Sequence, residues 1–460
     1  MKNTNYEMDM CRGSIVKKII SFSLPLMLTG ILQLFYNAAD IIIVGRFAGK
    51  EALAAVGSTA SLINLLVNVF LGLSVGASVT VARHYGAGDH VSVRHAVHTS
   101  IALALISGVA VGALGFAMAK PLLTMMGSPA DVIQSATLYM RIYFLGMPAN
   151  LLYAFGSAIL RAVGDTKRPL MFLTLSGLIN VALNLLFVIV LRIDVAGVAL
   201  ATIIAQVVSA VLVMRCLMHT TGSIRFMPSE MRIHSKSLGM ILRIGLPAGL
   251  QGTLFSVSNV LIQSSVNSFG SAVMAGNAAA GSLEGFVYTA MNSIYQASLT
   301  FVSQNAGAKQ YRRVRRILWV CLALVAGVGL TIGRLFILLA PWLISIYNAD
   351  PQVIQYGVLR LNIICSMYFL CGMMEVLVGQ LRGLGYSLLP MVATLICVCV
   401  LRVVWVYTVF TSIGTVESLM WSYPISWSLA ALFHLSTYLV VQRKFPRENM
   451  PIDDAVCACR

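Results

Sequence analysis

Twelve long apolar runs, separated by short polar segments, follow one another along almost the whole chain. Each run is long enough for a transmembrane helix, which needs about 20 apolar residues to cross the hydrocarbon core of a bilayer. The runs occupy residues 19–44, 53–79, 95–118, 136–160, 170–191, 196–218, 241–267, 273–303, 317–340, 355–381, 390–411 and 416–441. The pattern predicts an all-α polytopic membrane protein with twelve transmembrane helices.

The composition agrees with this pattern and excludes a soluble protein. Of the 460 residues, 58% are hydrophobic and 10% are charged, whereas about 25% are charged in a typical soluble domain. No polar segment between the runs is long enough for a separate soluble domain. We find no phosphate-binding loop, metal-binding box or nucleophile with its base, so we expect neither an enzyme nor an ATP-driven pump, and no cofactor.

The net charge of +16 comes from basic residues that gather on one predicted side of the membrane. The two ends of the chain and the alternate loops carry 24 of the 32 Lys and Arg residues. Cytoplasmic loops of membrane proteins carry such an excess. We therefore expect a multi-pass protein of the cell membrane with both termini in the cytoplasm, in contact with lipid rather than with nucleic acid.

An internal repeat divides the chain into two halves. Landmarks recur in order at a shift of 221 or 222 residues, and they are Ser23-Leu24-Pro25 with Gly245-Leu246-Pro247, Gly86-Ala87 with Gly307-Ala308, Leu160-Arg161 with Leu381-Arg382, and Pro169 with Pro390. The predicted lobes are residues 1–222 and 223–460, with six helices each. Because six is an even number, the lobes share one orientation and are expected to be related by a pseudo-two-fold axis along the membrane normal.

One carboxylate interrupts the first apolar run. Asp40 lies where a charge costs roughly 2.5–3.5 kcal/mol on insertion scales, so such residues usually face an aqueous cavity and bind ions, protons or cationic ligands. The alternative is a protonated aspartic acid that is hydrogen-bonded to a neighbouring helix. We expect Asp40 to be functional.

Several motifs resemble the multidrug and toxic compound extrusion (MATE) family over nearly the whole chain. They are the run Asp40-Ile41-Ile42-Ile43-Val44-Gly45-Arg46, the ends Gly86-Ala87-Gly88-Asp89 and Gln304-Asn305-Ala306-Gly307-Ala308, and the Leu-Arg pairs at 160 and 381. The resemblance implies a twelve-helix exporter with two lobes. It also implies that entry of protons or sodium ions drives the expulsion of small cationic amphiphiles. We expect the protein to be a monomer.

The resemblance also implies a cation site in the first lobe. The family's first-helix aspartate matches Asp40, its fifth-helix polar pair matches Asn180 and Asn184, and its sixth-helix threonine matches Thr202. Some relatives have an aspartate where Asn184 stands, so the choice between proton and sodium stays open. Independently of the family, Asn180 and Asn184 are four residues apart and share one helix face, from which both can meet Asp40. They could instead only join helices.

Two further acids, Glu284 and Glu375, lie well inside apolar runs. Glu284 resembles an acidic position in the eighth helix of many family members, and with Tyr36 and Glu375 it is a candidate substrate or second coupling residue. For Glu375 we favour an ion pair with Arg402, at a similar depth in the next run. Three histidines near the first cytoplasmic loop are expected to be solvated, namely His84, His95 and His98.

Three functions remain open from the sequence. The first is a secondary antiporter that exports drugs in exchange for protons or sodium ions. The second is a flippase for lipid-linked precursors, which would favour several arginines in the cleft between the lobes. The third is a membrane-embedded enzyme or receptor, which would need a catalytic constellation or a signalling domain that we do not find.

Overall fold

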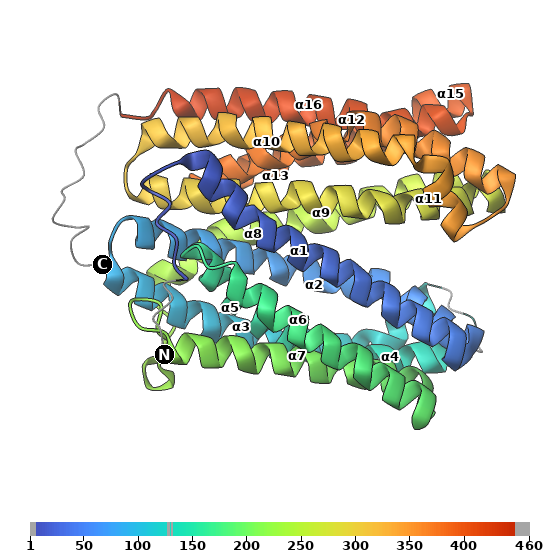
Figure 1. Cartoon of the computed structure of the whole chain (residues 1–460), viewed down its shortest axis with the longest axis horizontal. Coiled ribbons are helices and arrows are strands. Elements are labelled where there is room, and N and C mark those ends of the chain that lie inside the picture. Colours follow the sequence, from blue (N-terminus) through green and yellow to red (C-terminus); the bar gives the residue numbers. More distant parts are fainter. Residues whose placement is uncertain (1–5, 127–128, 130–131, 447–460) are drawn as a thin grey trace. The chain divides into compact units, whose positions relative to one another are not determined.

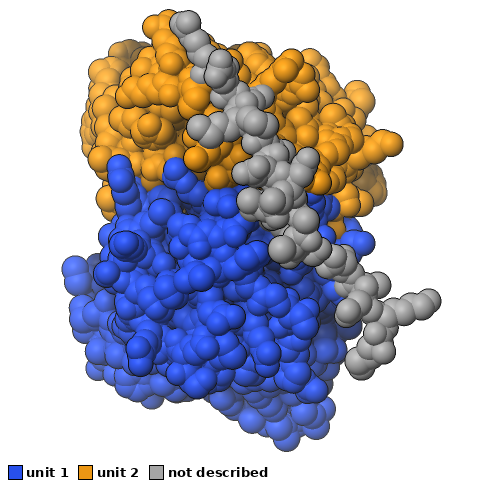
Figure 2. All heavy atoms as spheres, turned by 90° about the vertical axis from the view of Figure 1, so that its left-hand side faces the viewer, with its two compact units in different colours: residues 1–9, 28–249 blue, residues 10–27, 250–460 orange. Residues whose placement is uncertain are grey.

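The computed structural model describes residues 6–126, 129 and 132–446, and every regular element among them is a helix (Figure 1). The chain forms two compact units, which Figure 2 distinguishes by colour. The N-terminal unit comprises residues 1–9 and 28–249, and the C-terminal unit comprises residues 10–27 and 250–460. The predicted boundary between residues 222 and 223 falls in the connector between two helices and stays a prediction.

The N-terminal unit contains most of the first eight α-helices. Two π-helical segments, η1 and η2, continue α1 and α6, and a 3-10 turn, η3, lies in the connector before α8. The elements are α1 (Ile15–Ile43), η1 (Val44–Ala48), α2 (Gly49–Gly86), α3 (His90–Met125), α4 (Ile133–Leu145), α5 (Met147–Ala162), α6 (Lys167–Asn184), η2 (Leu185–Val190), α7 (Asp194–His219), η3 (Pro228–Glu230) and α8 (Ser235–Asn267). The first part of α1 and the last part of α8 belong to the C-terminal unit.

The C-terminal unit contains the remaining helices. Its eleventh apolar run is one helical stretch in which α-helical and π-helical segments alternate. The elements are α9 (Ser271–Gly307), α10 (Tyr311–Leu338), α11 (Ala340–Tyr347), α12 (Pro351–Gly383), α13 (Leu388–Thr394), η4 (Leu395–Val400), α14 (Leu401–Trp405), η5 (Val406–Phe410), α15 (Thr411–Ile413) and α16 (Val416–Gln442).

Each of the twelve predicted spans corresponds to a helix or a helical stretch of the described chain. Ten helical segments are long and apolar enough to cross a membrane, and the bent pair α4–α5 forms an eleventh. The twelfth is α9, a helix of 37 residues whose small and polar side chains lower its hydropathy. The prediction of a twelve-helix, all-α membrane protein is confirmed.

One span differs from the expected continuous helix. The run predicted at 136–160 is broken at Gly146, where α4 and α5 meet at an angle of 47°. Pro148 occupies the first turn of α5. Because its ring nitrogen cannot donate a hydrogen bond to the preceding turn, the helix restarts there instead of continuing.

Glycines bring α2 and α8 into backbone contact within the N-terminal unit. Gly72 and Gly76 on α2 face Gly245 and Gly249 on α8, and a Cβ atom added to Gly249 would lie 2.3 Å from the carbonyl oxygen of Val69. Both pairs have the small-xxx-small spacing that lets membrane helices approach closely. This part of α8 is therefore held to the N-terminal unit by backbone packing.

The corresponding contact in the C-terminal unit uses serines. The repeat relates Ser23 on α1 to Gly245, and Ser293 on α9 to Gly72. The Ser23 hydroxyl donates a hydrogen bond of 3.4 Å to the carbonyl oxygen of Ser293. Each unit therefore holds a segment of the first helix of the other half through small residues.

The connector between α7 and α8 is packed onto α3. Met227 donates its backbone N–H to Nε2 of His98 at 3.2 Å, while Nδ1 of His98 donates to the carbonyl oxygen of Arg94 at 2.8 Å. His234 donates its backbone N–H to the Thr99 hydroxyl at 3.0 Å. The prediction that His98 is solvated is wrong, because its ring is buried and positions the connector.

The glycine contact gives a stability prediction for α8. Gly249→Ala should destabilise the protein by about 1–3 kcal/mol, because the methyl group would overlap the backbone of α2. The matched control is Gly239→Ala on the same helix, where an added Cβ meets nothing within 4 Å. Thermal melting of the purified proteins in detergent would measure the difference. Equal melting temperatures for the two variants would contradict the tight contact.

Candidate functional site

A cavity of about 430 Å³ lies inside the N-terminal unit, between α1, α2, α4, α5, α6 and α7. Among the described residues that line it, Asp40 is the only one with a charged side chain. The other polar lining residues are Gln33, Tyr36, Asn37, Asn64, Tyr139, Tyr143, Asn150, Tyr153, Ser176, Asn180, Thr202, Gln206 and Ser209. The cavity therefore presents one carboxylate among amide, hydroxyl and phenol groups.

Asn184 binds the carboxylate directly. Its side-chain amide donates a hydrogen bond of 2.5 Å to Oδ1 of Asp40, and the same nitrogen lies 3.4 Å from Oδ1 of Asn180. The Asn184 side chain is fully buried, whereas Asp40 is half-buried and lines the cavity. Oδ1 of Asn184 has no hydrogen-bond partner. A buried acceptor therefore stands unused beside the carboxylate.

The other predicted members of the cation site lie around the same cavity. Asn180 and Thr202 both line it, on α6 and α7. The Thr202 hydroxyl donates to the carbonyl oxygen of Val198 at 3.0 Å, which leaves the lone pairs of its oxygen available. The structure thus brings Asp40, Asn180 and Thr202 to one space, with Asn184 behind the carboxylate. Their roles in ion coupling stay predictions.

The π-helical segments begin directly after this polar group. Segment η1 starts four residues after Asp40, and η2 starts immediately after Asn184. Single-turn π segments occur frequently at functional sites. The repeat places a π segment in the second half too, because a shift of 221 residues carries the start of η2 onto the start of η5.

Tyr36 has a fixed position on the cavity wall. Its hydroxyl donates to the carbonyl oxygen of Thr174 at 3.2 Å, and its ring lies so close to Gly177 that an added Cβ would be 1.9 Å from Cε2. Only glycine at position 177 leaves room for this ring. Tyr36 is therefore placed to contact a ligand in the cavity, as its candidacy requires.

Sequence reasoning missed several polar residues of the cavity. Tyr139 and Tyr143 line it with their rings 6.1 Å apart, and Tyr153 and Gln206 complete this wall. The available signal was the spacing of four residues between Tyr139 and Tyr143, which places both on one helix face. Phenols in an apolar run are also ordinary at membrane interfaces, so this signal was ambiguous.

The oxygen atoms around Asp40 are those that hard cations prefer. Carboxylate, amide and hydroxyl oxygens suit such ions, whereas histidine and cysteine would favour transition metals. Across the described part of the chain, no group of three or more His, Cys, Asp or Glu residues could hold a metal ion. The donor set therefore suits a hard cation better than a transition metal.

In the C-terminal unit, Glu284 pairs with Arg360. Two hydrogen bonds of 2.7 Å join Nε and Nη2 of Arg360 to the two carboxylate oxygens of Glu284, and Nη1 donates to Oδ1 of Asn277 at 2.5 Å. All three side chains are buried. A bidentate pair of this kind neutralises Glu284 within the protein.

The predicted ion pair between Glu375 and Arg402 is wrong. Arg402 donates to Oδ1 of Asn259 at 3.0 Å and to the Ser426 hydroxyl at 3.2 Å, and its guanidinium lies 4.3 Å from the centre of the Tyr423 ring. The similar depth of the two residues was a poor guide, because α14 turns Arg402 toward α16 and not toward Glu375 on α12. Within the described chain, Glu375 makes no hydrogen bond or ion pair.

Comparisons with known proteins identify relatives of this architecture. The MatE family model matches residues 25–186 and 247–408, one segment in each half. A probable multidrug resistance protein, YoeA of Bacillus subtilis, is 25% identical over 94% of this chain and 95% of its own length. The probable multidrug resistance protein NorM of Thermotoga maritima is 27% identical over 84% of each chain.

Further comparisons give a relative that is named for one substrate and a solved structure with the same fold. A protein named FAD transporter, from Shewanella oneidensis, is 23% identical over 93% of this chain and 95% of its own length. The solved outward-facing structure of a multidrug resistance MATE family transporter superposes with a TM-score of 0.89, at 22% identity, over 96% of this chain and all of that one. At that identity the likeness concerns the fold alone.

The buried pair in the C-terminal unit gives a second stability prediction. Glu284→Gln should cost about 3–5 kcal/mol, because it leaves the Arg360 guanidinium buried without its counter-charge. The double variant Glu284→Gln with Arg360→Leu should recover part of this loss. The exposed Glu417→Gln is the control. Melting of purified protein would test this, and a wild-type melting temperature for Glu284→Gln alone would refute the pairing.

Proposed function

Because the chain belongs to the MatE family of transporters, we propose that it exports small cationic amphiphiles in exchange for protons or sodium ions. The observation that carries this proposal is the single carboxylate, Asp40, in a cavity otherwise lined by neutral groups. The names of the multidrug resistance relatives support a similar substrate class for this chain.

The cavity suits a cation with an aromatic or apolar body. The negative charge of Asp40 attracts a cation, and the tyrosine rings offer faces that bind one by the cation–π interaction, worth about 0.5–2 kcal/mol each. Apolar lining residues such as Val56 and Ile63 would contact the apolar part of the ligand. Amide and hydroxyl groups supply hydrogen bonds without selecting one substrate.

Coupling follows from competition for one carboxylate. A cationic drug needs Asp40 charged, whereas a proton or a sodium ion neutralises it. The unused Oδ1 of Asn184 could accept the O–H of protonated Asp40, or could coordinate sodium beside the carboxylate. Both ions would then weaken drug binding, and the drug would leave when the cavity opens to the outside. The same oxygen serves either ion, so the local chemistry does not choose between them.

The lining residues disfavour the flippase alternative. A pyrophosphate-linked lipid would need cationic side chains around the cavity, and none of the described lining residues is Lys or Arg. Among the described residues of the C-terminal unit, three arginines are buried, but protein groups bind each of them. These arginines are Arg360, Arg382 and Arg402. The same argument disfavours an anionic substrate in the cavity, such as the one named for the FAD transporter relative.

The positions of the basic residues support the orientation in the membrane. The connector between the halves, which contains Arg225, Arg232 and Lys236, would lie in the cytoplasm together with both termini. The protein would then reside in the cell membrane as a monomer surrounded by lipid. Drug would enter the cavity from the cytoplasm or the inner leaflet.

The first functional prediction concerns Asp40. Asp40→Asn should reduce drug efflux from vesicles to the level of vesicles without the protein, because the substitution keeps the size of the side chain and removes its charge. The matched control is Asp194→Asn, the same change at an exposed carboxylate of α7. Efflux driven in turn by a proton gradient and by a sodium gradient identifies the coupling ion. Normal efflux by the Asp40 variant at normal protein level would overturn the proposal.

The second functional prediction concerns charge balance. One elementary charge moved across the membrane potential is worth about 2.3 kcal/mol per 100 mV. Since Asp40 is the only charged lining residue among those described, we expect one monovalent ion to enter for each monovalent drug that leaves. Efflux from proteoliposomes clamped with potassium and valinomycin should therefore be independent of voltage. A steep increase at inside-negative voltage would require a second ion site.

A further inference from the structure

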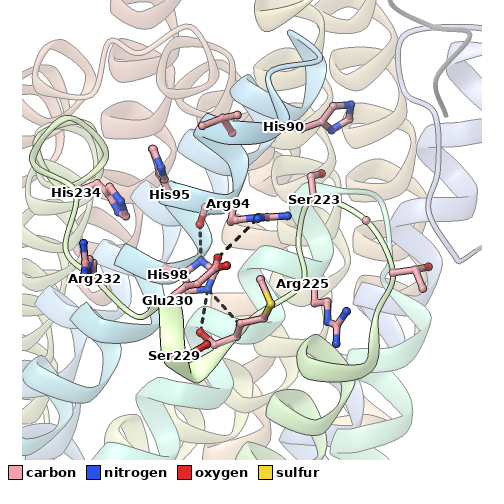
Figure 3. Close-up of a pocket in the computed structure, with 14 residues that line it drawn as sticks. His90, Arg94, His95, His98, Ser223, Arg225, Ser229, Glu230, Arg232 and His234 are labelled. Carbon is pink, nitrogen blue, oxygen red and sulfur yellow. Dashed lines mark hydrogen bonds and ion pairs between the residues drawn. The ribbon is translucent and has the colours of Figure 1, made fainter.

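A second, larger cavity lies at the connector between the halves, within the N-terminal unit. It has a volume of about 910 Å³, and its walls are the first turns of α3 and the connector residues that precede α8 (Figure 3). Pockets for small ligands commonly have volumes of about 300–1,000 Å³. The cavity is separate from the one around Asp40, with which it shares no lining residue.

The walls of this connector pocket are fixed by the fold. Hydrogen bonds from the backbone of Met227 and His234 join the connector to α3. The side chains of Ile224 and Phe226 are in addition buried in an apolar cluster with residues of α3 and α7. Phe226 also donates its backbone N–H to the carbonyl oxygen of Leu217 at 3.0 Å. The polar side chains of the connector are therefore carried by a packed loop.

Positive charge exceeds negative charge on these walls. Arg94, Arg225 and Arg232 line the pocket, and Glu230 is the only carboxylate among the described lining residues. Arg94 and Glu230 approach only to 3.7 Å, with side chains that are 48% and 45% exposed, so their pair is weak. Within the described chain, the side chains of Arg225 and Arg232 have no hydrogen-bond or ion-pair partner.

Neutral donors accompany the guanidinium groups. The hydroxyls of Thr221, Ser223 and Ser229 line the pocket, and Figure 3 shows Arg225 on the side of Ser223 and Arg232 on the side of His234. The ring of His234 stacks on His95 at 3.8 Å between centres. Burial and the neighbouring His95 lower the pKa of His234, so this ring adds little positive charge at neutral pH.

We propose that the connector pocket binds a phosphate ester, with Arg225 and Arg232 as its principal ligands. Guanidinium groups match phosphate oxygens with two parallel hydrogen bonds, and hydroxyl groups complete such sites. The guanidinium groups of Arg225 and Arg232 lie on different sides of a large pocket. This arrangement suits a ligand that is larger than its phosphate group. The ligand would come from an anionic phospholipid headgroup or from a soluble phosphate ester.

The usual explanation for these residues is membrane topology, and it does not account for their arrangement. Topology requires basic residues on one side of the membrane and places no demand on where they point. Lys236 and Arg243 satisfy it from exposed positions on α8 outside the pocket. Arg94, Arg225 and Arg232 instead all line one cavity, together with three hydroxyls. Asp89 precedes α3, and hydrogen bonds from Ser92 lower its pKa and so keep its carboxylate charged. This negative charge would repel an anion, but Asp89 does not line the pocket.

The test compares two double variants of the full-length protein that remove equal charge. Arg225→Gln with Arg232→Gln removes the free guanidinium groups of the pocket, and Lys236→Gln with Arg243→Gln removes two nearby charges outside it. All four positions are exposed, so both variants should fold, and thermal melting would confirm this. Binding of sn-glycerol 3-phosphate is measured by titration calorimetry in detergent. Binding of phosphatidylglycerol, against phosphatidylcholine, is measured by native mass spectrometry after extraction from nanodiscs of both lipids.

We expect the wild-type protein to bind at least one of the two probes. The pocket variant should lose about tenfold or more in affinity, equivalent to about 1.4 kcal/mol, and the outside variant should keep it. Binding of the soluble ester would identify a soluble ligand, and retention of phosphatidylglycerol alone would identify a lipid headgroup. The proposal is overturned if neither probe binds to the wild type, or if the two variants lose binding equally. Because Asp40 is not involved, this result is independent of the transport proposal.

Discussion

A charged side chain inside a membrane span usually needs a partner in the protein or a water-filled cavity, because its burial in hydrocarbon is costly. The hydrogen bond from Asn184 to Asp40 meets this demand in the N-terminal unit and requires α1 and α6 to be neighbours. In the C-terminal unit, the pair of Glu284 with Arg360 does the same for α9 and α12. These pairs select which helices lie together, whereas apolar contacts alone would be similar for many arrangements.

The two units satisfy this demand differently, and the difference gives them different chemistry. Asp40 accepts a hydrogen bond from one neutral donor, and its carboxylate lines a cavity. Glu284 receives a bidentate arginine and has no remaining charge to offer. One half of the repeat therefore presents a carboxylate to a cavity, and the other half uses its buried ion pair to hold helices together. The second half is not a second copy of the same site.

Much of the fold and part of the site could be predicted from the sequence. Apolar runs identified all twelve spans, because burial in lipid demands continuous hydrophobicity, and the spacing of Asn180 and Asn184 placed them on one face near Asp40. The partners of Glu375 and Arg402 could not be predicted, because depth along a helix does not fix the direction in which a side chain points. The break at Gly146 was missed because Pro148 does not interrupt an apolar run.

The division of α1 and α8 between the units has a consequence for biosynthesis. The N-terminal unit needs residues 235–249, which follow its own six spans, and the C-terminal unit needs residues 10–27, which are made long before the rest of that unit. Domains usually fold one after another, from the N-terminus, as the chain is made. Here the N-terminal unit cannot be completed until the beginning of the second half has been synthesised. The start of α1 finds its partners only after much of the second half has been made. A fragment that ends at residue 222 would contain six complete spans and still lack the segment of α8 that packs on Gly72 and Gly76.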